Sequence, residues 1–80
     1  DDAIDNSVII SPNPTSDYMK VQSLNNITNI SLYDVLGNIV KKIFPNSNSY
    51  ILDCTSLPKS QYLLQVNTDD GEKTISIVVQ

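Results

Sequence analysis

The last third of the sequence contains two short segments in which apolar and polar residues alternate. Every second residue is apolar between Tyr62 and Val66, and again between Thr74 and Val79. A period of two puts alternate side chains on opposite faces of a β-strand, whereas a helical face needs a period of about 3.6 residues. The residues Asp69-Asp70-Gly71-Glu72 between the segments have the composition of a tight turn. The sequence therefore predicts a β-hairpin with one buried face.

The rest of the chain also divides into short apolar segments separated by turn residues. Nothing between the turns has the period of a helix. The expected strands are residues 8–10, 18–22, 27–33, 39–44, 50–53, 62–66 and 73–79. About seven strands at this spacing are typical of an all-β fold of the immunoglobulin kind, an antiparallel β-sandwich.

Particular residues are expected to shape the turns. Prolines cannot donate to a strand ladder, glycine takes a positive φ easily, and Asp34 can bond the backbone of its own turn. A tyrosine at the start of the sixth strand of such sandwiches often bonds the backbone upstream. The residues assigned to turns and to this corner are Pro12, Asn13, Pro14, Asp34, Gly37, Leu57, Pro58, Tyr62 and Gly71.

Composition limits the kinds of function that fit the chain. Its 80 residues allow one domain with a small core, and its one cysteine, Cys54, allows no internal disulfide. A net charge of -4 without arginine argues against nucleic acid as a partner. The chain also has no histidine, the commonest general base and a frequent metal ligand. We therefore expect no catalytic residues, no cofactor and no enzymatic activity.

Two clusters have residue types that occur in ligand sites. The acidic turn Asp69-Asp70-Gly71-Glu72 matches no complete calcium loop, so we expect solvated charges and no metal there. Tyr18, Tyr33 and Tyr50 would suit stacking on a sugar but fall on different expected strands. An adhesive or carbohydrate-binding β-sandwich module of a cell-surface protein remains the alternative function.

The length of the apolar runs and the composition of the opening residues indicate where the domain begins and whether it spans a membrane. No apolar run approaches the roughly 20 residues that span a bilayer, so no membrane-spanning segment is expected. The acidic opening has the composition of a linker. We therefore expect residues 1–7 to end a linker from an upstream cargo domain and residues 8–80 to form the domain itself.

Three ordered motifs resemble those of one known family. They are Pro12-Asn13-Pro14-Thr15-Ser16-Asp17-Tyr18, then Ile30-Ser31-Leu32-Tyr33-Asp34-Val35-Leu36-Gly37-Asn38-Ile39-Val40, then Ser56-Leu57-Pro58-Lys59-Ser60-Gln61-Tyr62-Leu63-Leu64-Gln65-Val66. In order and spacing the chain is similar to the type A C-terminal sorting domain of the type IX (Por) secretion system. The resemblance runs from about Val8 to Gln80.

The resemblance implies a signal for secretion of an attached protein by Bacteroidota. Cargo would pass through the periplasm and cross the outer membrane, to be released or held at the cell surface. The implied partners are the type IX machinery and a sortase-like peptidase that removes the domain before Val8. The residues expected to be recognised by the translocon are Lys73, Ile75, Ile77, Val78 and Gln80.

Two positions depart from the family pattern. Ser60 stands where the family usually has glycine, and the ending Val79-Gln80 lacks a frequent lysine. The first departure concerns the turn before Tyr62. The second concerns the strand where the resemblance places recognition.

Overall fold

Six β-strands make up the regular structure in the computed structural model, which describes residues 8–13 and 15–80. They are β1 (Val8–Ser11), β2 (Tyr18–Tyr33), β3 (Ile39–Ile43), β4 (Ser47–Asp53), β5 (Ser60–Thr68) and β6 (Gly71–Val79). Within these residues no helix is long and apolar enough to cross a membrane. The expected linker, residues 1–7, and Pro14 lie outside the described residues.

The longest strand, β2, contains 16 residues and pairs antiparallel with four others. Its first part, from Tyr18, pairs with β1 and β4, and its last part, to Tyr33, pairs with β3 and β5. The register shifts between Gln22 and Ile27, where the strand bends without ending. The expected strands 18–22 and 27–33 are thus the two ends of one strand, and the count of about seven is not confirmed.

The polar bend of β2 explains this difference. Residues 23–26 are one serine, one leucine and two asparagines, a polar composition that predicts a connection between two strands. In the structure the Nδ2 group of Asn48 donates hydrogen bonds to the carbonyl oxygens of Ser23 and Leu24, at 3.4 and 3.2 Å. Because side-chain hydrogen bonds satisfy these backbone groups, the chain stays extended through the bend.

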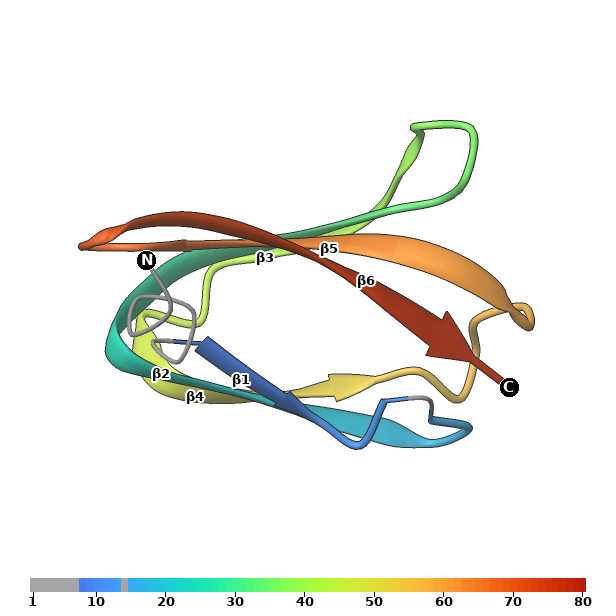
Figure 1. Cartoon of the computed structure of the whole chain (residues 1–80), viewed down its shortest axis with the longest axis horizontal. Helices are drawn as coiled ribbons and strands as arrows, with labels where there is room; N and C mark the ends of the chain where they lie inside the picture. Colours follow the sequence, from blue (N-terminus) through green and yellow to red (C-terminus); the bar gives the residue numbers. More distant parts are fainter. Residues whose placement is uncertain (1–7, 14) are drawn as a thin grey trace.

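The single sheet curls over its own core. Its strand order is β1-β2-β5-β6, with β3 and β4 attached to β2. Figure 1 shows β3, β5 and β6 on one side of the molecule and β1 and β4 on the other, with β2 running through both sides. The all-β antiparallel class is confirmed, whereas a sandwich of two separate sheets is not.

The inward faces of both sides fill one hydrophobic core. Alternate residues of β2, β5 and β6 are buried, as the period of two predicts. The most buried side chains are Met19, Val21, Ile27, Ile30, Leu32, Leu52, Cys54, Leu64, Val66 and Ile77, each at most 1% exposed. Burial of this kind is the main contribution to the stability of a domain without a disulfide. Burial also raises the pKa of the Cys54 thiol.

Candidate functional site at the edge of the C-terminal strand

Strand β6 presents different residues to the core and to solvent. Ile77 and Val79 are 0% and 3% exposed, and Ile75 packs against the core from a partly buried position. Between them, Ser76 and Val78 point outward, and 40% of Val78 is exposed. The strand therefore stabilises the fold through one face and is accessible from the other.

Strand β6 also lies at the edge of the sheet. It pairs with β5 along its whole length, from the Ser60–Val79 pair to the Thr68–Gly71 pair. No other described strand pairs with its second edge. A strand edge carries a row of backbone N–H and C=O groups that can pair with another extended chain.

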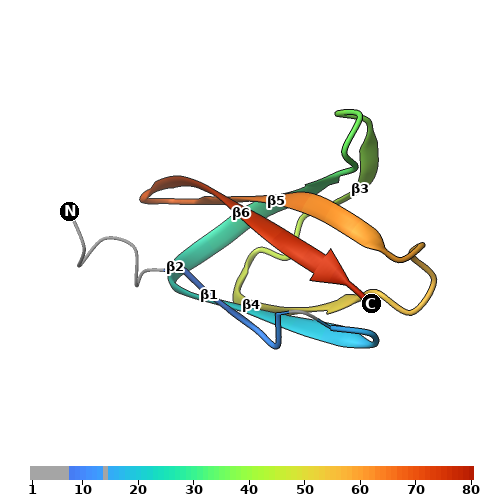
Figure 2. The same cartoon turned by 45° about the vertical axis from the view of Figure 1, so that its right-hand side comes forward.

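Asn13 and Thr15 contact part of this outer edge. Asn13 donates from Nδ2 to the carbonyl oxygen of Ser76 at 3.2 Å, and its Oδ1 accepts from the Val78 N–H at 3.1 Å. The Thr15 N–H donates to the Val78 carbonyl at 3.0 Å, and its own carbonyl accepts from the Gln80 N–H at 2.7 Å. In Figures 1 and 2 the end of β6 accordingly reaches the connection between β1 and β2.

The structure places the five expected recognition residues along β6 and at the residue after it, although on different faces. Ile75 and Ile77 point toward the core, whereas Val78 and Gln80 are exposed. Lys73 is half-buried. Since Ile77 is fully buried, its side chain is inaccessible in the folded domain, and its backbone faces β5. Recognition by these residues stays a prediction.

Asp34 organises the hairpin between β2 and β3. Its Oδ1 accepts hydrogen bonds from the N–H groups of Leu36 and Asn38, both at 2.9 Å, and Oδ2 accepts from Asn38 Nδ2 at 3.4 Å. The backbone hydrogen bond from Asn38 is the largest cause that lowers the Asp34 pKa. Gly37 completes the turn with a φ of 89°, a conformation that suits glycine.

The corner before β5 is held by Tyr62. Its hydroxyl donates to the carbonyl oxygen of Pro58 at 2.6 Å, and Leu57 packs against the core from a partly buried position. At the other end of β5, Gly71 begins β6 with a φ of 141°. Pro12 ends β1 and lies at an exposed position. The bond from Tyr62 fixes the start of β5, and the positive φ of Gly71 allows the turn into β6.

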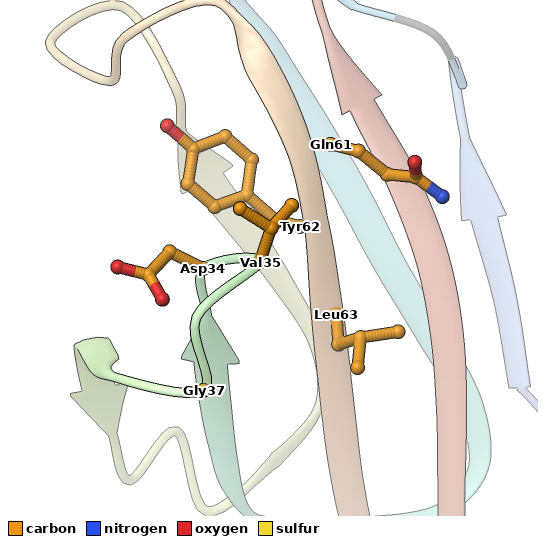
Figure 3. Close-up of a pocket in the computed structure, with 6 residues that line it drawn as sticks. All are labelled: Asp34, Val35, Gly37, Gln61, Tyr62 and Leu63. Atoms are coloured by element: carbon orange, nitrogen blue, oxygen red, sulfur yellow. The ribbon is translucent and has the colours of Figure 1, made fainter.

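A pocket of about 310 Å³ lies between the β2–β3 hairpin and the start of β5. Figure 3 shows Val35 beside Tyr62, while Gln61 and Leu63 lie on the opposite face of β5. The Asp34 carboxylate is already engaged in its own turn. The pocket therefore offers mainly apolar contact.

Sequence reasoning placed Asn13 in a turn but missed its contact with β6, and it missed Thr15 altogether. Thr15 is only 6% exposed, and its Oγ1 donates to the Tyr18 carbonyl at 2.9 Å. A small polar residue after a proline-rich turn gives no signal for a contact with a strand so distant in sequence. Among the described residues, no three Asp, Glu or Cys side chains are grouped so as to hold a metal ion.

Comparisons with known proteins agree with the motifs of the sequence. The family model for secretion system C-terminal sorting domains matches residues 9–80. A similar solved structure is that of PorZ, an essential bacterial surface component of the type-IX secretion system of the human oral-microbiomic Porphyromonas gingivalis. The TM-score is 0.73 and the identity 14% over 94% of this chain, which spans 12% of that chain. The likeness to PorZ therefore concerns the fold. No curated protein matches the chain.

Proposed function

Because the chain belongs to the family of secretion system C-terminal sorting domains, we propose that the type IX machinery recognises it through β6 and exports the protein attached to it. Membership in this family implies export to the cell surface or secretion. The chain's own contribution is recognition rather than catalysis. The cargo first enters the periplasm and then crosses the outer membrane.

The observation that supports β6 as the recognition element is its position at the edge of the sheet. Ser76 and Val78 direct backbone groups away from β5, as their contacts with Asn13 establish. An extended partner segment can pair with such groups whatever its side chains, while pockets or exposed side chains add selectivity. Val78 supplies an exposed apolar side chain beside this edge.

A sortase-like peptidase then acts on the exported protein. The proposed cleavage point lies before Val8, because the family match begins at residue 9 and the preceding residues are acidic and linker-like in composition. Mass spectrometry of the mature cargo tests this step. A new carboxyl terminus at or upstream of residue 7 is expected, and a mature cargo that retains β1 would contradict it.

The export experiment uses a periplasmically targeted fluorescent protein fused to the N-terminus of the chain in a type IX-competent host. Ser76→Pro removes the N–H that points to the outer edge of β6 but leaves the pairing of β6 with β5. Ser76→Ala is the matched control, since it removes the same side-chain contact with Gln61. Export is expected for the unchanged and alanine forms and is expected to be lost for the proline form.

A further fusion lacking residues 74–80 gives the reference level without export. If the unchanged fusion is folded but remains in the periplasm at this reference level, the sorting function is wrong. The adhesive or carbohydrate-binding module would then be the better account. If the Ser76→Pro fusion is folded and exported normally, the sorting function is supported, but the proposed pairing of a partner with the edge of β6 is wrong.

A further inference from the structure

Asn13 acts on β6 as a piece of neighbouring strand would. A primary amide offers both a donor and an acceptor, like a peptide group. Asn13 uses both, donating to the Ser76 carbonyl and accepting from the Val78 N–H. One side chain thus pairs with two consecutive outward backbone groups of the strand.

Thr15 continues the same pairing with its backbone. Its N–H and C=O bond the Val78 carbonyl and the Gln80 N–H, and this makes a parallel bridge between Thr15 and Val79. The Thr15 hydroxyl accepts from the Asp17 N–H at 3.2 Å and donates to the Tyr18 carbonyl, which fixes the residue in place. We call Asn13 and Thr15 together the edge cap.

The edge cap occupies only the end of β6. Its four hydrogen bonds reach from Ser76 to Gln80, and none of those given for the described residues joins the cap to Gly71–Ile75. The cap is also short, since it forms a single bridge where β5 forms nine residue pairs with β6. Because each hydrogen bond adds only a modest net stabilisation, so short a contact is easier to open than the β5–β6 ladder.

We propose that the edge cap is a displaceable substitute for a partner strand, and that an extended segment of the secretion machinery pairs with residues 76–80 in its place. This inference rests on the proposed function. The occupant is an extended polypeptide because the cap itself satisfies these groups by backbone and amide pairing. Displacement of the cap frees two N–H and two C=O groups of β6, and an extended segment offers a matching row of donors and acceptors.

A reversible cross-link between the cap and β6 tests the displacement. Thr15 and Val79 are directly opposite in a parallel bridge, where strands lie about 4.8 Å apart, and disulfides accept Cα separations of roughly 4.4–6.8 Å. The double variant Thr15→Cys/Val79→Cys is made with Cys54→Ala, so that no third thiol competes. Oxidising conditions in the periplasm favour formation of the disulfide.

The cross-linked fusion is expected to stay in the periplasm with export reduced at least 10-fold. Added reductant is expected to restore export, so the same double variant in reductant gives the level of export without the cross-link. Equal export of the double variant in its oxidised and reduced forms, at a level above the truncated fusion and with the disulfide verified by mass, would overturn the proposal. The fusion lacking residues 74–80 separates failure of this proposal from failure of the sorting function. The sorting function fails only if the unchanged fusion is exported no better than this truncated fusion.

A second variant tests the cap without a cross-link. Asn13→Ala removes both side-chain bonds to β6, whereas the control Asn48→Ala removes two bonds to Ser23 and Leu24 on the bend of β2. Amide exchange of Val78 is expected to be roughly 10-fold faster in Asn13→Ala than in Asn48→Ala. Export of Asn13→Ala should equal or exceed that of the control. An unchanged Val78 exchange rate, or slower export by a folded Asn13→Ala, would contradict the cap.

Discussion

The hydroxyl of Tyr62 donates a 2.6 Å hydrogen bond to the carbonyl oxygen of Pro58, four residues earlier in the chain. Tyr62 is 4% exposed, so this bond lies at the border of the core. It ties the turn that precedes β5 to the strand itself. The contact resembles the tyrosine corner that is common in immunoglobulin-like domains.

Replacing Tyr62 by phenylalanine removes this hydrogen bond and keeps the ring. We expect the free energy of unfolding to fall by about 0.5–1.5 kcal/mol, the net contribution of one hydrogen bond, because the partly buried bond to the Pro58 carbonyl is lost. Urea denaturation of both proteins measures the change. Tyr18→Phe serves as the control, since Tyr18 is 53% exposed, and its effect should stay below about 0.5 kcal/mol. Equal effects of the two substitutions would count against the corner.

Leu64→Ala tests whether β5 packs on the hydrophobic core. Leu64 is fully buried on β5, opposite Leu32 of β2 and Ile75 of β6. A loss of about 2–5 kcal/mol in the free energy of unfolding is expected from the cavity left behind. Leu36→Ala removes the same atoms from a residue that is 83% exposed and should be nearly neutral. Similar losses for both would show that Leu64 is not in the core.

Gly71→Ala tests the turn that leads into β6. A φ of 141° strains any L side chain, although no atom lies within 4 Å of an added Cβ. The expected cost is therefore one of backbone conformation alone, about 1–2 kcal/mol. Thermal unfolding measures it, with Ser60→Ala at the opposite end of β5 as a control. A stability equal to that of the control would indicate that the turn adopts another conformation.

The hairpin held by Asp34 should weaken in acid. The folded hairpin favours the carboxylate and lowers the Asp34 pKa. Its contribution is complete above the ordinary Asp pKa and is lost as the pH falls through the lower, folded value. The amide resonances of Leu36 and Asn38 should therefore shift together below about pH 4. In Asp34→Ala this shared transition should be absent, and its persistence would assign it to another group.

Cys54 should react slowly with alkylating reagents while the domain is folded. Its side chain is 1% exposed, and burial raises the pKa of the thiol, so both access and thiolate content are low. Mass spectrometry after treatment with iodoacetamide should show slow modification in buffer and fast modification in denaturant. Rapid modification of the native protein would mean that the β4 side of the core opens readily.

The alternation of apolar residues made most of the strands predictable, because one face of each strand packs on the core. Ile77 and Val79 are buried and Val78 is exposed, as the period of two required. Fusion of the segments 18–22 and 27–33 was not predictable, because it depends on Asn48 bonding the backbone of the bend. A loop and a bent strand can have similar local sequences when a residue distant in the chain hydrogen-bonds the backbone groups of the bend.

The candidate site was predictable only in part for the same reason. The family resemblance implied recognition through the strand that forms β6, and this stays a prediction. The structure adds that this strand lies at the edge of the sheet. The contacts of Asn13 and Thr15 with Ser76 and Val78 join opposite ends of the chain. Such contacts follow from how the sheet curls, which no local period or turn composition determines.

Every strand pairing in the described part of the chain includes β2, except that between β5 and β6. A protease that cuts once in the bend between Gln22 and Ile27 therefore leaves β1 and the first part of β2 on one fragment, and β4, which pairs with that part, on the other. Neither fragment keeps the whole core, because Met19 lies on the first fragment and Leu64 on the second, and a sheet needs its apolar face covered to be stable. Proteolysis of this domain accordingly leaves either the whole fold or short peptides, with no stable smaller fragment between them.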